Sequence, residues 1–234
     1  MEARQPSIRN RILAGLQPAD FALLQPCLEE VHLPHRRQLE APNRPIEHVY
    51  FIEHGLASVV AAGSSNQSIE LALIGREGMT GLSVILDTDR STNETSMQCA
   101  GEGWRIATID LRLAMERSPT LQKTFLHYAY ALVTQMGFTA LVNGRGKIHE
   151  RLSRWLLMAD DRTDGSILKL THEGLSLMLG VRRAGITNAL NALKKRGILD
   201  AQRGAISILD RDALKESANG SYGGPELEYQ RLFG

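Results

Sequence analysis

The segment from Ile167 to Leu209 constrains the fold of this chain more than any other part. Thr171 is a good N-cap for a short amphipathic helix, and Gly180 is expected to end that helix in the left-handed conformation. A second helix is expected from about residue 183 to residue 196. The inward apolar positions of the two helices are Leu175, Met178, Leu179, Ile186, Leu190 and Leu193. Two short helices joined by a tight glycine turn form a helix-turn-helix pattern.

A β-hairpin is expected directly after the second helix. Residues 200–204 have the composition of a turn, and AISIL at 205–209 has the composition of a returning strand. A short strand around Leu168 and Leu170 precedes the first helix. A hairpin in this place is the wing of a winged helix-turn-helix. The pattern alone also fits an αα-hairpin of an unrelated domain. The charge distribution around it helps to distinguish the two.

Charge is distributed unevenly along the chain, although the formal net charge is only +1. Residues 145–218 carry 14 Lys and Arg against 9 Asp and Glu, whereas the rest of the chain carries 13 against 17. The densest basic stretch is 180–204, where six basic residues accompany one acid, Asp200. Solvated faces normally mix the two signs. The asymmetry therefore indicates a C-terminal part that faces nucleic acid.

Two roles are expected within this basic segment. Arginine can pair bidentately with guanine and asparagine with adenine in the major groove, so the outward residues of the second helix are candidates for reading bases. These candidates are Arg182, Arg183, Thr187, Asn188 and Asn191. Residues without that register suit phosphates, which position a protein without reading sequence. The phosphate candidates are Thr171, Lys194, Lys195, Arg196 and Arg203.

The N-terminal half is predicted to hold short helices followed by antiparallel β-structure. Apolar residues between 8 and 31 recur at helical spacing and are interrupted by Pro18 and Pro26. The expected strands are VYFI (49–52), LASVVAA (56–62), IELALIG (69–75), TSMQC (95–99) and WRIATI (104–109), separated by EHG, GSSNQS and AGEG turns. Several short strands at regular spacing favour an antiparallel sandwich or barrel over a dinucleotide-binding fold.

A long helix is expected from Pro119, with Ser118 or Thr120 as its cap. Its apolar residues step by four and three, which fits a dimerising heptad seam and also a helix packed on its own sheet. We expect the seam to join two copies, so that Leu132→Glu weakens dimerisation and leaves the fold intact. The expected seam residues are Leu121, Phe125, Tyr128, Leu132, Met136 and Val142. Two glycines within 143–146 mark the end of the helix.

Several classes of site lack their sequence signals. The two cysteines, Cys27 and Cys99, are too few for a zinc or iron–sulfur site, so we expect no metal and no cofactor. His48 and His54 are too far apart for a cupin metal pair, and no nucleophile elbow or phosphate loop occurs, so we expect no enzyme. No apolar run reaches the length of a membrane span, and the N-terminus lacks the apolar core of a secretory signal. We expect a soluble, cytoplasmic protein with no membrane partner.

The sequence resembles a known family in several places. THEGLSLMLGVRRAGITNALNALKKRGIL, followed by RGAISILDRDAL, resembles the DNA-binding domain of the cyclic-AMP receptor protein/fumarate–nitrate regulator (CRP/FNR) family. VYFIEHGLASVV and IGREGMTGL resemble that family's cyclic-nucleotide-binding β-roll, and the long helix resembles its dimerisation helix. The resemblance covers about residues 10–218. It implies an α+β fold with a β-roll sensor domain (1–118), a dimerisation helix (119–144), a winged helix-turn-helix (145–218) and a tail (219–234).

The resemblance implies a homodimeric transcription regulator that binds palindromic double-stranded DNA and acts on RNA polymerase. By position, Arg183 matches the family's guanine-reading arginine. Ala184 stands where many members have an acidic base-reading residue, and Asn188 stands where the cyclic-AMP branch has a second arginine. The half-site is therefore expected to differ from that of the cyclic-AMP branch. In the tail, Tyr222, Tyr229 and Phe233 either dock on the protein or fray.

The sequence does not identify the small molecule that would bind the β-roll. Cyclic-AMP-binding members place a glutamate after the cassette glycine, but here Leu82 follows Gly81, and Arg90 lies in an acidic loop. We expect an unidentified small-molecule effector, and the alternative is a cyclic-nucleotide-responsive regulator of the cyclic-AMP type. A regulatory subunit acting on other proteins is less consistent with the wing. The candidate pocket residues are Arg76, Glu77, Gly78, Met79, Gly81, Leu82 and Arg90.

Overall fold

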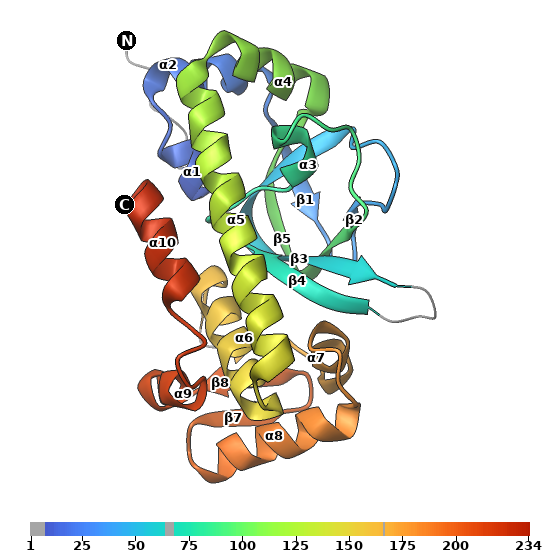
Figure 1. The fold of residues 1–234 in the computed structure, drawn as a ribbon, viewed down its shortest axis with the longest axis vertical. Helices are drawn as coiled ribbons and strands as arrows, with labels where there is room; N and C mark the ends of the chain where they lie inside the picture. The colour runs from blue at the N-terminus through green and yellow to red at the C-terminus, as the bar shows by residue number, and fades with distance from the viewer. Residues whose placement is uncertain (1–7, 64–67, 166) are drawn as a thin grey trace. The chain divides into compact units, whose positions relative to one another are not determined.

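The computed structural model describes residues 8–63, 68–165 and 167–234, which divide into two compact units (Figure 1). Unit 1 comprises residues 1–57 and 74–130, and unit 2 comprises residues 58–73 and 131–234. These limits differ from the domain boundaries expected at 118 and 144. The reason is that the segment 58–73 forms hydrogen bonds with helices of the C-terminal part, as described below.

The N-terminal β-structure is one five-stranded sheet. Its strands are β1 (Glu29–Leu33), β2 (Gln38–Glu40), β3 (His48–Ala62), β4 (Ser68–Ile74) and β5 (Glu94–Ala107). The strand order is β1-β5-β3-β4, and β2 pairs with β5. β1 and β5 are antiparallel, with Glu30 opposite Trp104. β3 and β4 are joined by a segment that includes residues 64–67, outside the described residues, where most of the expected GSSNQS turn falls.

Two expected turns are wrong, because EHG lies inside β3 and AGEG lies inside β5. The glycines of AGEG permit close contact between strands. A Cβ on Gly101 would lie 1.9 Å from the carbonyl oxygen of His54, and a Cβ on Gly103 would lie 2.2 Å from that of Phe51. Glycine in a strand can therefore mark a close backbone approach rather than a turn. The end of the WRIATI run is also not a strand, because α4 begins at Thr108.

Short helices surround this sheet in unit 1. They are α1 (Arg11–Ala14), α2 (Pro18–Leu24), the 3₁₀ helix η1 (Gln25–Cys27), α3 (Leu82–Ile85) and α4 (Thr108–Arg117). The buried Asp20 carboxylate accepts hydrogen bonds from the hydroxyls of Ser118, at 2.5 Å, and Thr120, at 2.8 Å. These bonds fix the start of the long helix α5 (Pro119–Arg145), which begins at the residue predicted.

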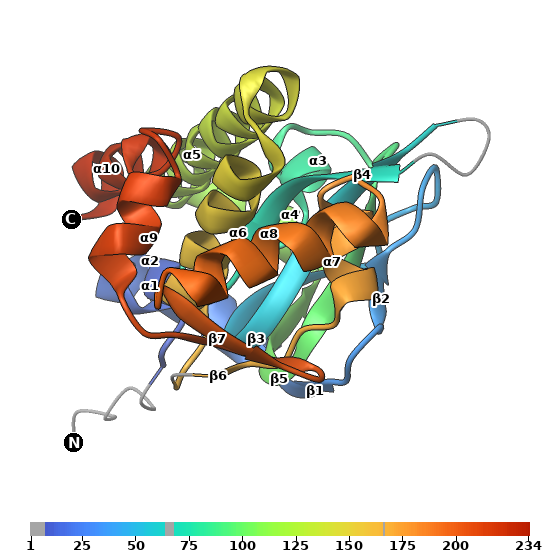
Figure 2. The ribbon, with the colours of Figure 1, turned by 90° about the horizontal axis from the view of Figure 1, so that it is seen from below.

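The C-terminal elements of unit 2 follow the predicted order. They are the second half of α5, α6 (Ile148–Arg162), β6 (Ile167–Leu168), α7 (His172–Met178), α8 (Arg183–Lys195), β7 (Leu199–Gln202), β8 (Ala205–Ile208), α9 (Arg211–Ser217) and α10 (Gly224–Phe233). The strands form a sheet in the order β6-β8-β7. Leu156, Leu190 and Leu193 are buried in the core of this unit. Figure 2 shows α7, α8 and the β7–β8 hairpin side by side.

Candidate nucleic-acid interface

The turn between α7 and α8 has the geometry predicted from its glycine. The Thr171 hydroxyl accepts a hydrogen bond from the Gly174 N–H at 3.0 Å and caps α7. Gly180 has φ of +59°, and its N–H donates to the Leu177 carbonyl. The next N–H, from Val181, donates to the Ser176 carbonyl at 3.0 Å. This pair of bonds is a Schellman cap, which ends α7 and allows α8 to start at Arg183.

Helix α8 separates a buried face from a polar face. Ile186, Leu190 and Leu193 are at most 1% exposed and hold the helix on the core. Four of the five base-reading candidates are exposed: Arg182 and Arg183 at the start of α8, and Asn188 and Asn191 further along it. Arginine and asparagine have the donors and acceptors that base edges in the major groove require.

Thr187 lies differently from the other four candidates. It is half-buried, and its hydroxyl donates to the Arg183 carbonyl at 3.2 Å and lies 3.0 Å from His172 Nδ1. His172 is the first residue of α7, so this contact joins the two helices of the motif. Burial and the contact with α7 were not visible in the sequence, where Thr187 simply shares the outward helical register.

Further basic side chains lie at the end of α8 and in the hairpin that follows it. Arg203 is exposed between β7 and β8, and Lys195 and Arg196 are exposed at the end of α8. Lys194 is partly engaged, because its ammonium group lies 2.6 Å from Asp200 Oδ1 and also donates to the Ala201 carbonyl. The hydrogen bond from Lys194 holds the pKa of the Asp200 carboxyl below its usual range. Lys194 therefore ties α8 to the wing while its side chain remains 49% exposed.

The comparisons with known proteins agree with this geometry. Residues 150–217 match the Crp-like helix-turn-helix domain family. The chain is also similar in fold to FixK2 from Bradyrhizobium japonicum, with a TM-score of 0.71 and 17% identity over 81% of this chain and 96% of that one. A CRP-family transcriptional regulator from Thermus thermophilus has a TM-score of 0.67 and 15% identity over 81% of this chain and 97% of that one. No curated protein sequence matches the chain.

The chain therefore carries a Crp-like helix-turn-helix domain and shares its fold with solved regulators of the CRP family. The match at 150–217 covers the motif just described, and the solved structures share the fold. The predicted fold class is confirmed: the chain has an N-terminal β-roll, a long helix and a C-terminal winged helix-turn-helix.

The seam residues predicted on α5 do not face outward. Leu121, Phe125, Tyr128, Leu132 and Val142 are between 0% and 6% exposed within the single chain, and Met136 is half-buried. Phe125 packs against Phe51, and the Tyr128 hydroxyl donates to the Met79 carbonyl at 2.7 Å. The prediction that this face forms the dimer seam is wrong, because the chain's own core already covers it.

A second apolar stripe lies on a neighbouring, exposed face of α5. Leu126, Tyr130 and Val133 are 43%, 55% and 51% exposed, and the small residues Gly137 and Ala140 continue the line. The steps between these residues are four, three, four and three, which is a heptad register of its own. We call these five residues the exposed α5 stripe. The sequence contains this second register, but the parallel register of larger apolar residues is stronger and is therefore predicted as the dimer seam.

The two apolar faces also explain the overall hydropathy of α5. By length and composition alone it could cross a membrane, and less than half of its most apolar part is buried. This corrects the expectation that no segment is long and apolar enough. A helix with one face in the core and a second face exposed gives the same composition, so the finding is weak evidence for a span.

The predicted effector residues do not line the cavity over β1, β3 and β5 that is described below. Gly78, Met79 and Gly81 are buried, Arg76, Glu77 and Leu82 are half-buried, and Arg90 is exposed. Arg90 forms an ion pair with its neighbour Asp89 at 2.8 Å. The Gly81 N–H donates to Glu40 Oε1 at 2.5 Å, and the Thr95 hydroxyl donates to Glu40 Oε2 at 3.0 Å. The Glu40 carboxylate therefore already binds the N–H group of Gly81, the residue that matches the family's cassette glycine.

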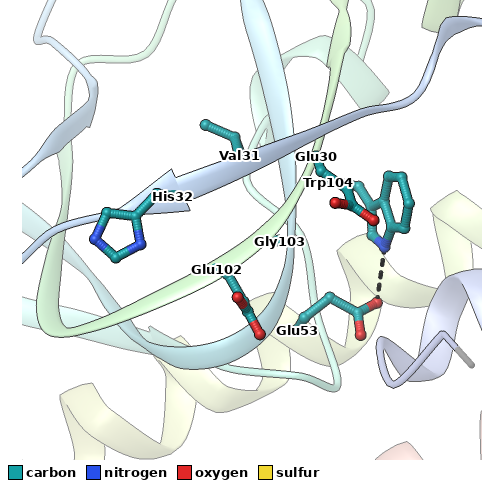
Figure 3. Close-up of a pocket in the computed structure, with 7 residues that line it drawn as sticks. All are labelled: Glu30, Val31, His32, Glu53, Glu102, Gly103 and Trp104. Atoms are coloured by element: carbon teal, nitrogen blue, oxygen red, sulfur yellow. Dashed lines mark hydrogen bonds between the residues drawn. The ribbon is translucent and has the colours of Figure 1, made fainter.

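A cavity of about 310 Å³ lies instead over β1, β3 and β5 (Figure 3). Its lining includes the carboxylates of Glu30, Glu53 and Glu102 beside Trp104. Glu53 is already satisfied, because its two oxygens accept bonds from the Arg9 and Asn10 N–H groups and from Trp104 Nε1. The remaining carboxylates make this cavity unfavourable for a phosphate group. Sequence reasoning missed it because its residues come from three separate strands.

The C-terminal tail forms an ordered helix rather than a frayed end. The Tyr222 hydroxyl donates to Asp161 Oδ2 at 2.6 Å and accepts from Arg211, which also pairs with Asp160 and Asp161. Gly224 packs against the Phe138 ring of α5. Tyr229 and Phe233 stack on each other with centroids 4.6 Å apart. The sequence left docking or fraying open for these three aromatic residues, and Tyr222 is anchored on the winged helix domain.

Proposed function

We propose that this chain is a transcription regulator of the CRP/FNR type, which acts as a homodimer and reads an inverted repeat in double-stranded DNA. The observation that carries the proposal is the pairing of two exposed surfaces: the basic, amide-rich face of α8 and the exposed α5 stripe. The first offers base-reading groups, and the second offers a heptad line of apolar and small residues that a second copy can cover. A two-fold dimer presents two recognition helices, so its site should be a palindrome.

The experiment that tests this is selection of binding sites from random duplex DNA. The selected sites should contain two inverted half-sites with centres about 34 Å apart, one turn of the double helix. Sedimentation of the complex should give two chains per duplex. Recovery of single half-sites bound by one chain would contradict the dimeric reading, and no enrichment of any sequence would contradict sequence-specific binding.

Within the interface we assign roles by exposure. Arg182, Arg183, Asn188 and Asn191 are proposed to read bases, whereas Thr187 is proposed to support α8 through His172. Thr171, Lys194, Lys195, Arg196 and Arg203 are proposed to contact phosphates. As a cytoplasmic transcription regulator, the dimer would act on RNA polymerase bound nearby.

The affinity for DNA is expected to fall steeply with salt. Each phosphate that a Lys or Arg neutralises releases counterions, and the slope of log affinity against log salt is about −0.9 per phosphate. With four basic phosphate candidates in each chain, a dimer should show a slope of about −7. Fluorescence anisotropy between about 50 and 200 mM salt measures it. A salt-independent affinity would contradict the assignment of these residues to phosphates.

Cyclic AMP is expected not to bind tightly. Its phosphate requires free N–H donors and an arginine, and its ribose hydroxyl requires a carboxylate. Here the Gly81 N–H is taken by Glu40, Leu82 replaces the carboxylate, and Arg90 is exposed and paired with Asp89. Isothermal titration calorimetry with cyclic AMP and cyclic GMP should show no binding in the micromolar range. A micromolar dissociation constant for either nucleotide would favour the cyclic-AMP type of regulator.

A further inference from the structure

A buried carboxylate connects four elements of unit 2. Glu70 on β4 is 4% exposed, and its Oε1 accepts a hydrogen bond from Trp155 Nε1 of α6 at 2.6 Å. Its Oε2 lies 2.6 Å from the hydroxyl of Ser58 on β3. The same Ser58 hydroxyl lies 3.5 Å from the sulfur of Met178 on α7. A chain of contacts therefore runs from α6 through the β3–β4 hairpin to the first helix of the helix-turn-helix.

The same hairpin also packs against the turn that follows α7. A Cβ on Gly180 would lie 3.4 Å from Ile69 Cδ1, which is van der Waals distance. The base-reading candidates on α8 remain exposed in this arrangement. The hairpin can therefore support the motif without covering the face that reads DNA.

The charged groups around Glu70 do not cancel the cost of its burial. Arg154 and Arg162 of α6 act on it electrostatically and favour its ionised form. Arg154 is itself drawn toward Thr139, whose hydroxyl it contacts at 3.2 Å, and toward Glu226 of α10. Burial outweighs the hydrogen bonds and both arginines, and it raises the pKa of Glu70 to about 8.

The protonation state of Glu70 decides which hydrogen bonds this chain can make. A neutral carboxylic acid has one donor, which the Ser58 oxygen can accept, so the Ser58 hydroxyl is free to donate to the Met178 sulfur. An ionised carboxylate only accepts, so the Ser58 hydroxyl must turn to donate to Glu70. The Ser58 hydroxyl then no longer donates a hydrogen bond to the Met178 sulfur. Trp155 donates to Oε1 in both states.

We propose that Glu70 is a proton-controlled positioning residue: its neutral acid links α6 to α7 through Ser58, and loss of its proton to water breaks the link to α7. This role goes beyond DNA reading and requires neither the dimer nor an effector. Because α7 carries α8 through a tight turn, the linked state should hold the motif in fewer conformations and favour DNA binding.

The direction of the pH dependence follows from the raised pKa. The linked arrangement binds the proton more tightly than an exposed glutamate, whose pKa is 4.5. Its stabilising contribution is therefore complete below about pH 4.5, decreases as the pH rises, and is lost as the pH passes through about 8. Near pH 8, a small change of pH should change the population of the link.

Tryptophan fluorescence tests the proposal without DNA. In Trp104→Phe, Trp155 is the only tryptophan, and its emission should titrate with a midpoint near pH 8 because its N–H partner gains a charge. In the same background, Glu70→Gln should give a flat profile between about pH 6 and pH 10. Trp155→Phe is the matched control, because it leaves Trp104 bonded to Glu53 at 3.1 Å. A flat parent profile, or an unchanged titration in Glu70→Gln, overturns the proposal.

A second variant keeps the titrating group in place. The Ser58 hydroxyl favours the ionised form of Glu70, so Ser58→Ala should move the fluorescence midpoint to higher pH. An unchanged midpoint would overturn the relay even if Glu70→Gln failed to fold. In anisotropy titrations with a selected duplex, the ratio of affinities at pH 7 to pH 9 should be several-fold larger in the wild type than in Glu70→Gln. Equal ratios would remove the role in positioning α7 while leaving DNA binding itself unaffected.

Discussion

Val133→Glu is expected to convert the proposed dimer into a folded monomer, whereas Leu132→Glu is expected to unfold the chain. The two residues are neighbours on α5, but Val133 is 51% exposed on the α5 stripe and Leu132 is 3% exposed in the core. A charge on Val133 stays in water in the monomer and is buried only when a second copy covers the stripe. A charge at position 132 would be buried even in the monomer, because the chain's own core surrounds this position.

The magnitudes separate the two outcomes. Truncating or charging a central interface residue costs about 2 kcal/mol or more, and two-fold symmetry counts the cost twice. The dimer dissociation constant of Val133→Glu should therefore rise by about three orders of magnitude. Burying an unpaired charge in the core in Leu132→Glu should cost about 4 kcal/mol or more of the free energy of unfolding. That is a large share of the stability of a typical domain.

Light scattering and thermal unfolding followed by circular dichroism measure these two quantities. Leu86→Glu is the matched control, because Leu86 is 54% exposed but lies outside α5, so this variant should remain dimeric and stable. A Val133→Glu variant that stays dimeric would show that the exposed stripe is not the interface. A Leu132→Glu variant that folds normally and dissociates would restore the face predicted from the sequence.

Arg183→Ala is expected to reduce affinity for the selected site by about 1–3 kcal/mol and to relax the preference at one base position. Arg183 is the first residue of α8 and is exposed, so its loss should not affect the fold. Lys195→Ala serves as the comparison, because Lys195 is exposed at the other end of the same helix. Its loss should weaken binding evenly on all sequences and reduce the salt slope by about 1.

Anisotropy titrations with the selected site, with single-base variants of it and with random duplex separate these effects. Arg183→Ala should lose affinity mainly on the selected site. Its affinity for random duplex should fall only by the small amount that the loss of one positive charge causes. If both variants lost equal affinity on every duplex, Arg183 would be a phosphate contact. The base-reading role would then fall to Arg182, Asn188 or Asn191.

The sequence by itself determined the helix-turn-helix and which of its residues are exposed. Thr171 caps α7, Gly180 turns the chain, and the spacing of Ile186, Leu190 and Leu193 fixes which face of α8 is buried. These signals are local, because a cap, a left-handed glycine and a 3.6-residue period each act within a few residues. The exposed residues follow directly once the buried face is known.

Only the tertiary structure decided what covers each surface. The α5 sequence contains two apolar registers, and choosing between core and dimer requires knowing that Phe51 and Met79 lie against one of them. The glycines of β5 resemble turn residues in sequence, but their role depends on how closely β3 approaches. Glu70 reads as one polar residue in an alternating strand, and its pKa is raised by burial, against the hydrogen bonds from Ser58 and Trp155, which lie 12 and 85 positions away. Burial and partners distant in the chain are properties of the packed molecule, and no local pattern carries them.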